Sequence, residues 1–564
     1  MARLRLAGLG WDALAGLAVA GIMVPEAVAY AGIAGLAPGR ALAAGVAGGL
    51  AYALLGRSRF AVVSPTSSSA AILAAALANL SGVSLAGGSG SVGAQAMDAN
   101  VTALTLLAGL LFAALALARL GSLAGFVSRP VLRGFTFGLA LTIIVRQLPH
   151  IAGVPDLGGP VWSVLWGVVR AMPNWNGASL ACGLGALMLL ALLRRWPVVP
   201  GPLLVMALGI AGARWSGLGG GLAAHGVALA GPAPLALALP TLPGDPAVWL
   251  RLAPLALPLV LILFAESWGT IRTLALAHGD RLSANRELAA LGLANACAAL
   301  AQGMPVGAGF SAGNASAAAG ARSRMAGLIA AVALLVLALW AGPLIAQIPR
   351  PVLAAVVIAA LTHALAPAPL LRPWRLGRDR WTAPSAALGV LMLGVLDGML
   401  LAIGLSLAQL LYRLAHPSLS ELGRLSPDVP DDPEQGHDFV DRRAHPEAGV
   451  VPGLALYRPN APLFFANAET VLGLVATRAQ TAGCKVVVLS LEESDDLDST
   501  AAEALAELHA TLVARGGRLI LARTHDRARA VIAAAGPAMA ELARHATFSV
   551  ADAVALAQTP IPEA

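Results

Sequence analysis

Apolar stretches of about 18–22 residues follow one another along the first 416 residues, and each is long enough to cross the ~30 Å hydrocarbon core of a bilayer. The pattern predicts about thirteen membrane spans, several of them interrupted by Pro and Gly. Because the amino-terminal run passes into further apolar stretches without pause, we expect a first membrane helix rather than a signal peptide. The expected spans are 12–30, 40–56, 62–79, 101–118, 130–148, 179–193, 198–214, 252–278, 287–303, 311–319 extended by a bend, 326–347, 351–366 and 384–414.

The pattern changes after His416, which ends the expected transmembrane domain 1–416. Residues 417–450 are rich in Pro, Asp, Glu and Arg and predict a linker and domain entry. Residues 451–564 are too polar to span a membrane, so we expect them to form a separate domain in the cytoplasm.

The carboxyl-terminal domain has the pattern of a small α/β fold. The runs LFFANA (463–468), KVVVLSL (485–491) and RLILAR (518–523) are typical of strands. The segment 499–516 has apolar residues at helical spacing and ends at Gly516. Strand, helix and strand in this order predict a central sheet with helices packed on it.

Composition supports a membrane protein. Hydrophobic residues make up 58% of the chain and charged residues only 12%, and the mean hydropathy is +0.76. A soluble domain has roughly 25% charged residues, so an ordinary soluble enzyme and a disordered chain are excluded. The three cysteines have no spacing that suggests a disulfide framework or a metal site, and we expect no cofactor.

The net charge of +7 is the sum of two opposite parts. The first 416 residues hold 25 Arg and 10 acidic residues, and the remainder holds 12 basic and 20 acidic residues. The basic residues of the first part lie in short loops between apolar runs, where they orient spans in the membrane. We therefore do not interpret the basic pI as a sign of nucleic-acid binding.

One spacing is repeated in the two halves of the membrane part. Pro65 follows Glu26 by 39 residues, and Pro305 follows Glu266 by 39 residues. In each half an apolar segment with one carboxylate precedes a segment that is broken by Pro and small residues, SPTSSSA (64–70) and MPVGAGFSAGNAS (304–316). Two interrupted segments in matching places predict an inverted-repeat transporter with its binding site between them.

A helix that starts inside the membrane can bind an anion. Its first N–H groups have no intrahelical partner, and its dipole places about half a positive charge at that end. Thr66, Ser67 and Ser68 stand where one such helix would begin, and Ser311 stands where the other would. The alternative is that these small residues only allow close helix packing.

The expected intramembrane carboxylates are Glu26, Glu266 and Asp397. A bare charge at the bilayer centre costs at least about 3 kcal/mol, so we expect each carboxylate to serve either transport or structure. For Glu26 and Glu266 the hypotheses are coupling to H⁺ or Na⁺ and a structural hydrogen bond to a neighbouring helix. Asp397 is expected at a helix end. Tyr30 lies one helical turn from Glu26 and either lines the site or packs in the core.

The sequence GFSAG (309–313) fits the nucleophile elbow of hydrolases. That motif requires a strand, a sharp turn and a helix with a His and an acid nearby, whereas here the flanks predict membrane helices. We therefore expect a transporter and not an enzyme.

Several long segments resemble the sulfate permease (SulP) family of anion transporters, and the resemblance covers nearly the whole chain. VPEAVAYAGIAGLAP resembles the first-span signature of the family, which usually has Gln where Glu26 stands. The other segments that carry the resemblance are SRPVLRGFTFGLALTIIVRQLPHIAGV (128–154), ANRELAALGLANACAALAQGMPVGAGFS (284–311), GARSRMAGLIAA (320–331) and IPRPVLAAVVIAAL (348–361).

The resemblance implies fourteen spans in two inverted seven-span repeats, with a core that moves against a gate or scaffold domain, and it implies a homodimer. It also implies an anion held between the third and tenth spans. The residues expected at that site are Glu26, Tyr30, Thr66, Ser67, Ser311 and Ala312 for the anion, with Glu266 and Glu26 for the coupling ion.

The carboxyl-terminal segments PGLALYRPNAPLFFANAE (452–469) and SDDLDSTAAEALAELHATLVARGGRLILAR (494–523) resemble a STAS domain. In the related anti-sigma-factor antagonists, the loop before the first helix carries a Ser or Thr that is phosphorylated, and here the matching residues are Ser499 and Thr500. Thr500 is also expected to cap the following helix. The resemblance implies a cytoplasmic protein partner for this domain.

One departure from the family concerns specificity. Many relatives have Phe-Ser-Arg-Ser at the start of the tenth span, whereas this chain has Phe310, Ser311, Ala312 and Gly313. The absent Arg would have supplied a fixed charge and two parallel hydrogen bonds for an oxyanion. A singly charged anion such as bicarbonate, chloride or a carboxylate is therefore favoured over tight sulfate binding.

These observations predict a secondary active anion transporter of the inner membrane that works by alternating access. Two alternatives stay open at this point: a nucleobase-type permease of the same architecture, and a passive anion channel or membrane-anchored signalling scaffold.

Overall fold

The computed structural model describes residues 2–84, 91–122, 128–155, 157–196, 201–214, 221–231, 240–368, 370–371, 380–425 and 439–559. The chain forms two compact units, Met1–Ser406 and Leu407–Ala564. Each unit is built around its own apolar core.

The described residues of the first unit form helices and two three-residue strands. Its helices are α1 (Ala2–Ile33), α2 (Pro38–Leu55), α3 (Ser67–Ser84), α4 (Ser91–Leu117), α5 (Arg129–Ala152), α6 (Val161–Arg170), α7 (Gly177–Leu193), α8 (Gly201–Arg214), α9 (Gly221–Ala224), α10 (Pro246–His278), α11 (Ala284–Leu300), α12 (Phe310–Ala318), α13 (Met325–Ile345), α14 (Arg350–Leu361), α16 (Thr382–Leu393) and α17 (Val395–Ala415). The strands are β1 (Val63–Pro65) and β2 (Val306–Ala308), and the short 3₁₀ helices are η2 (Met172–Asn174) and η4 (Thr362–Leu365).

Four helical segments in the described part of the chain are long and apolar enough to cross a membrane by themselves. They are Leu9–Ile33, Ala96–Leu117, Arg129–Ala152 and Pro246–His278. Eight shorter apolar helices of 10–17 residues accompany them. The predicted helical, multi-span membrane domain is confirmed.

Two details of the span prediction were wrong. The expected single span 384–414 is divided into α16 and α17, because Gly394 has a φ of 93°, a left-handed conformation that ends a helix. The ten-residue helix α6 was not predicted, because it is shorter than the stretch that crosses a bilayer.

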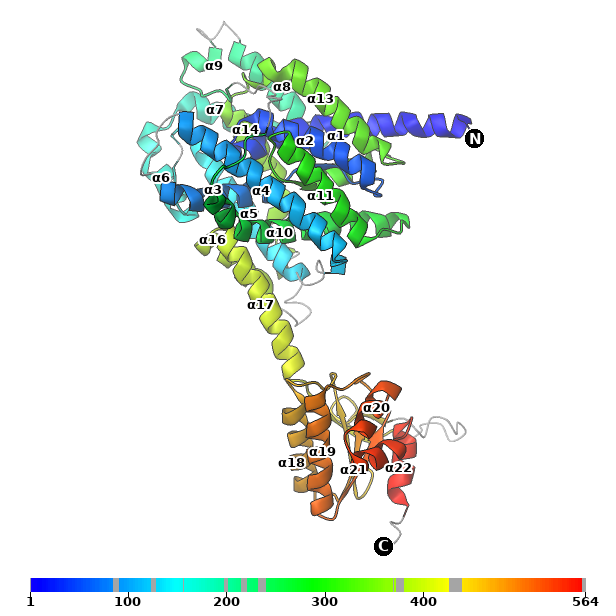
Figure 1. Cartoon of the computed structure of the whole chain (residues 1–564). Helices are drawn as coiled ribbons and strands as arrows, with labels where there is room; N and C mark the ends of the chain where they lie inside the picture. The colour runs from blue at the N-terminus through cyan, green and yellow to red at the C-terminus, as the bar shows by residue number, and fades with distance from the viewer. Residues whose placement is uncertain are drawn as a thin grey trace. The chain divides into compact units, whose positions relative to one another are not determined.

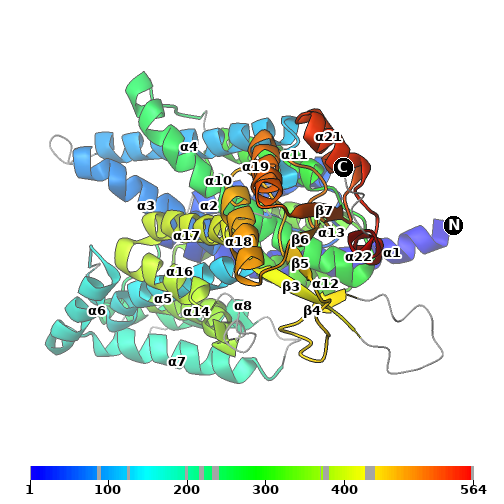
Figure 2. The same ribbon diagram turned by 90° about the horizontal axis from the view of Figure 1, so that it is seen from below.

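The helices of the first unit form two groups. In one group, α11 lies against α2 and α4, and α13 lies against α1 and α2; Figure 1 shows α4 and α11 running side by side. In the other group, α5 packs against α7, α14 and α16, and these helices lie together in Figure 2. This division is the one expected for a transport core and a gate or scaffold domain.

The close crossing of α4 and α11 depends on glycine. A Cβ atom at Gly109 would lie 2.8 Å from the backbone N of Ala296, and a Cβ at Gly292 would lie 3.2 Å from the backbone O of Gly109. Such contacts are too short, so a larger residue forces the two helices apart.

We expect Gly109→Val to destabilise the membrane domain by about 1–3 kcal/mol, the usual cost of overpacking. The measurement is thermal unfolding of the purified protein in detergent or lipid. Gly185→Val is the matched control, since a Cβ at Gly185 has no atom within 4 Å. Equal melting temperatures for the two variants would contradict the close crossing.

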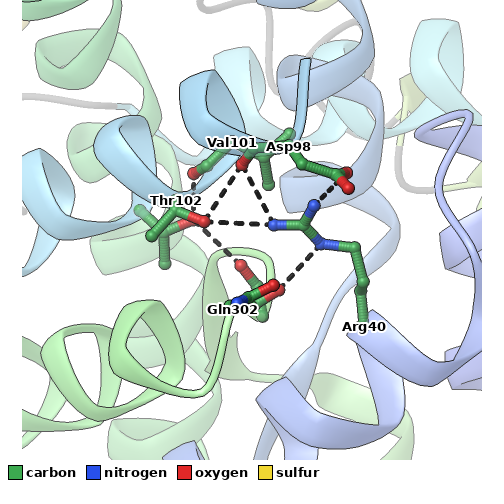
Figure 3. Close-up of polar contacts among 7 residues, drawn as sticks. Arg40, Asp98, Val101, Thr102 and Gln302 are labelled. Atoms are coloured by element: carbon green, nitrogen blue, oxygen red, sulfur yellow. Dashed lines mark hydrogen bonds and ion pairs between the residues drawn. The ribbon is translucent and has the colours of Figure 1, made fainter. Parts of the chain in front are cut away.

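A partly buried arginine, Arg40, fixes the turn that leads into β2 (Figure 3). The Arg40 guanidinium donates from Nε to the carbonyl of Gln302 at 2.7 Å and from Nη2 to Thr102 Oγ1 at 3.1 Å. It also forms a salt bridge with Asp98. Gln302 has a φ of 54°, an uncommon conformation for a residue with a side chain, and the bond from Arg40 holds it there.

Two further buried carboxylates, Asp12 and Glu287, were not among the predicted intramembrane acids Glu26, Glu266 and Asp397. Asp12 accepts hydrogen bonds from the backbone N–H groups of residues 322 and 323 at 2.7 and 3.0 Å, and so connects α1 to the loop before α13. Glu287 is fully buried and accepts from the Tyr52 hydroxyl at 2.5 Å. Both groups are structural, because their oxygens are bound by donors from neighbouring segments.

The second unit is an α/β domain with a five-stranded sheet. The strands are β3 (Leu419–Arg424), β4 (Phe439–Asp441), β5 (Leu454–Pro459), β6 (Val486–Ser490) and β7 (Arg518–Ala522), in the order β4-β3-β5-β6-β7. β5, β6 and β7 are parallel, and β3 is antiparallel to both of its neighbours. The helices are α18 (Ala468–Thr481), α19 (Ser499–Ala514), α20 (Asp526–Ala534), α21 (Pro537–Arg544) and α22 (Val550–Gln558).

The two faces of this sheet carry separate cores. Helices α18 to α21 cover one face, where Val487, Leu489 and Leu521 are buried. Helix α22 covers the other face, where Val488 and Ile520 are buried. Successive side chains of β6 are buried alternately in the two cores, as expected for a strand whose two faces are both covered.

The predicted strands at 485–491 and 518–523 and the helix at 499–516 are confirmed, and the strand at 463–468 is wrong. The last stretch is a turn that leads into α18, where Asn467 binds the backbone N–H of Phe464 at 3.0 Å. The stretch 417–450, expected to be a linker and domain entry, contributes β3 and β4 to the sheet.

Candidate functional site

Two short extended segments from the two halves of the membrane domain lie side by side. β1 and β2 form an antiparallel pair with Ser64 opposite Gly307, and all six residues of the pair are buried. After one further residue on each chain segment, α3 begins at Ser67 and α12 begins at Phe310. The prediction that the two broken segments come together is confirmed.

Side chains from α10 and α11 hold β2 in place. Ser267 accepts a hydrogen bond from the N–H of Ala308 at 2.9 Å. The Asn295 amide accepts from the N–H of Val306 and donates to its carbonyl, both at 2.9 Å. Asn295 is fully buried, so these bonds fix the position at which α12 starts.

Asn295 and Ser267 were not among the predicted site residues. An Asn inside the apolar segment 287–303 is a detectable signal, because a buried amide requires hydrogen-bond partners. Its partner is eleven residues further along the chain, however, and no helical spacing indicates that contact.

The first turn of α3 is capped by its own side chains. The N–H of Ser69 donates to Thr66 Oγ1 at 3.1 Å, and the N–H of Thr66 donates to Ser69 Oγ at 3.0 Å. This reciprocal pair is a capping box with Ser in place of the usual Glu or Gln. The N–H groups of Ser67 and Ser68 lie between the two caps and remain directed out of the helix end.

The first turn of α12 is not capped in this way. Its N-cap residue is Gly309, which makes no side-chain capping bond. Ser311, in the first turn, instead donates from Oγ to the Glu26 carboxylate at 2.8 Å. The helix ends lie close together, since a Cβ at Gly309 would be 3.8 Å from Thr66 Cγ2.

Glu266 reaches the other helix end. Thr66 Oγ1 donates to its carboxyl group at 3.5 Å, a long contact, and the Ser68 hydroxyl also interacts with that group. Each acidic residue therefore contacts one broken helix: Glu26 contacts α12 and Glu266 contacts α3.

The remaining predicted site residues differ in exposure. Ser67 is partly buried and Ser311 is exposed, so both can reach a solute. Tyr30 and Ala312 are buried, with exposed fractions of 7% and 1%. Ala312 therefore offers a solute its backbone N–H and not its side chain. Asp397 lies in the first turn of α17, as expected for a helix-end residue.

Charge is unbalanced at this site. The salt bridges between described residues lie elsewhere in the molecule, and none includes Glu26 or Glu266. In the part of the chain that the structure describes, the positive character of the site comes from the two helix ends. Two carboxyl groups without a basic partner require a proton or a cation to remain inside a membrane.

Comparison with known proteins identifies the fold. Residues 9–380 match the sulfate permease family, and residues 445–540 match the STAS domain. The chain belongs to the sulfate permease family.

Named relatives extend along most of this permease. A protein described as a "probable sulfate transporter" of Mycobacterium tuberculosis is 35% identical over 533 residues, which cover 93% of this chain and 91% of that protein. Human prestin is 26% identical over 485 residues, with 81% of this chain and 63% of prestin covered.

Solved structures have the same fold. The murine Solute Carrier 26 family member A9 anion transporter, in an inward-facing state, has a TM-score of 0.85 with 21% identity and covers 97% of this chain and 91% of its own. The transmembrane domain of a cyanobacterium bicarbonate transporter has a TM-score of 0.59 with 22% identity and covers 70% of this chain and 98% of its own.

The STAS domain of the permease has its predicted regulatory residues at the start of α19. Ser499 is exposed and Thr500 is partly buried. The expectation that Thr500 caps α19 is wrong, because the cap is Asp498, which accepts from the N–H of Ala501 at 2.8 Å. The second Asp498 oxygen accepts from the N–H of Phe465 at 2.7 Å.

We expect Asp498→Ala to destabilise the start of α19 by about 0.5–2 kcal/mol, the usual cost of losing a helix cap. Hydrogen exchange of the α19 amides in the full-length protein measures this loss as faster exchange. Asp495→Ala is the control, because the ion pair of Asp495 with Arg527 is exposed and 3.9 Å long. Equal exchange in the two variants would contradict the capping role.

Proposed function

We propose that this permease carries out secondary active transport of an anion across the cytoplasmic membrane by alternating access. The observation that carries the proposal is the antiparallel contact of β1 and β2, which brings the starts of α3 and α12 together. Two helix N-termini directed at one place attract negative charge without a buried Lys or Arg. The anion binds between Ser67 and Ser311.

The coupling ion is H⁺ or Na⁺, and Glu266 is its principal site. An anion and an uncompensated carboxylate repel each other strongly where water is excluded. A proton or Na⁺ at Glu266 removes this repulsion, so the loaded core carries a smaller net charge as it moves. Anion and cation are therefore transported together.

The substrate is sulfate, bicarbonate or a carboxylate, and the site favours a singly charged anion. Ala312 stands where the resemblance to the family places Arg in many relatives, so no fixed side-chain charge faces the anion from α12. One relative is described as a probable sulfate transporter and one structural neighbour as a bicarbonate transporter, which supports the anion class.

The STAS domain lies in the cytoplasm in this proposal, and the permease is a homodimer. Ser499 is the better candidate for regulatory phosphorylation because its side chain is exposed, and Thr500 is the second. A cytoplasmic protein partner would recognise this end of the domain. No enzymatic activity is proposed.

Purified permease in proteoliposomes tests the proposed function. Under an inward H⁺ or Na⁺ gradient, a labelled anion accumulates above its equilibrium level, and a competition panel of sulfate, bicarbonate, chloride, dicarboxylates and nucleobases orders the substrates. Competition by nucleobases alone would favour a nucleobase permease. Flux that only follows the electrochemical gradient, with no coupled cation, would favour a passive channel.

A further inference from the structure

Glu26 lies where the proposed function places the transported anion. Its carboxylate accepts the Ser311 hydrogen bond at 2.8 Å, in the first turn of a helix that has no side-chain cap. The N–H groups at the start of α12 and the positive end of its dipole favour any negative group at this position. A carboxylate of the protein and a solute anion therefore require the same donors.

We propose that Glu26 is a tethered competitor of the transported anion. When charged, it occupies the start of α12 through Ser311. When it takes up one proton from solution, it loses its negative charge and leaves the Ser311 hydroxyl and the α12 N–H groups to the anion. This inference rests on the proposed function: Glu266 remains the coupling site, and protonation of Glu26 sets how tightly the anion binds at this end of the site.

Among the described residues of the helices that pack against α1, each arginine has a partner other than Glu26. Six helices pack against α1: α2, α3, α8, α12, α13 and α14. Three of them, α3, α12 and α13, carry no charged residue. The arginines of α2, α8 and α14 lie at helix ends: Arg40 pairs with Asp98, Arg214 donates to Gln347, and Arg350 donates to the carbonyl of Leu229.

The titratable groups that interact with Glu26 are both acidic. Glu266 on α10 adds a second negative charge when ionised, and Tyr30 lies on the same helix as Glu26. An anion that enters while both carboxylates are charged meets two like charges, which disfavours binding most strongly for a doubly charged solute. Competition by Glu26 therefore also selects for singly charged substrates.

The test is the pH dependence of KM in proteoliposomes, with chloride, formate and sulfate as labelled probes. These probes keep their charge between about pH 5.5 and pH 8.5, so any change reports on the protein. In the wild type, KM for chloride or formate should rise with pH where Glu26 ionises, by up to about tenfold per pH unit, the limit for competition with one proton. Glu26→Gln should lower KM at the alkaline end by tenfold or more and flatten its rise with pH, because only Glu266 then titrates near the anion.

Glu266→Gln should keep the rise of KM with pH, because Glu26 is still present. Ser311→Ala should raise KM at every pH, because it removes a donor shared by carboxylate and anion. If Glu26→Gln raised KM or left its pH dependence unchanged, the inference would be wrong while the proposed function stood.

A wild-type protein that transports none of the three probes would overturn the proposed function itself, and with it this inference.

If Glu26→Gln fails to fold, the dependence of KM on pH in the wild type and in Glu266→Gln still tests the inference. A KM that is independent of pH in both proteins would overturn it. Glu26→Asp supplies a further check: its shorter side chain reaches Ser311 less well, so its KM at alkaline pH should lie between those of the wild type and Glu26→Gln.

Discussion

Glu266→Gln should abolish uptake of the anion against its gradient while leaving downhill exchange measurable. The amide keeps the size of the side chain and its contact with Thr66, which is 3.5 Å long in the wild type, but it carries no charge and binds no proton. Accumulation in proteoliposomes driven by a pH or Na⁺ gradient should fall to the level reached without a gradient. Coupled transport depends on a site whose charge changes, and this variant removes that change.

The matched control is Asp280→Asn, which makes the same kind of change just beyond the end of the same helix. Asp280 forms a salt bridge with Arg59 at 2.8 Å, away from the helix ends that form the site. It should retain gradient-driven accumulation. If Glu266→Gln accumulated the anion with an unchanged pH and Na⁺ dependence, the coupling role of Glu266 would be refuted.

Asn295→Leu should give the largest loss of stability among single changes near the site. It leaves the N–H and the carbonyl of Val306 without the Asn295 amide, and each orphaned buried group costs about 1–3 kcal/mol. The start of α12 is then no longer fixed against α3. We expect a clear drop in thermal stability in lipid, together with a loss of anion uptake.

Asn285→Leu is the control for this change, since Asn285 lies on the same helix and its side chain accepts from the N–H of Gly121, outside β2. It should reduce stability less and keep uptake. A stable Asn295→Leu protein with normal KM would show that β2 is held without this amide.

The sequence predicted the part of the site that depends on local chemistry. The breaks at SPTSSSA and MPVGAGFSAGNAS follow from Pro and small residues, which cannot continue a regular membrane helix without compensation. The equal spacing from Glu26 and from Glu266 then indicated that the two breaks belong together. The pairing of β1 with β2 is the physical result.

The contacts between distant segments could not be predicted in this way. Ser311 and Glu26 are separated by 285 residues, and no periodicity encodes which hydroxyl reaches which carboxylate. Asn295 and Glu287 show the same limit. Both are polar residues in an apolar helix, and only the folded structure distinguishes their structural bonds from a functional role.

The wrong strand at 463–468 has a comparable cause. Phe464 and Phe465 form an apolar run of the kind that strands contain, yet the backbone turns there because the Asn467 side chain binds its carbonyl and amide groups. Hydrogen bonds from the Asn467 side chain take the backbone groups that a strand would pair in a sheet. The pattern of apolar residues gives no sign of these bonds.

Cysteine protection tests the central claim most directly, namely that the anion binds between the starts of α3 and α12. Ser67→Cys and Ser311→Cys are made in a background that lacks the three native cysteines, and their rates of modification by a small water-soluble thiol reagent are measured with increasing concentrations of the transported anion. We predict that the anion slows modification at both positions, with half-protection near its KM. Transport of an anion that protects neither position, or only one of them, would contradict the account.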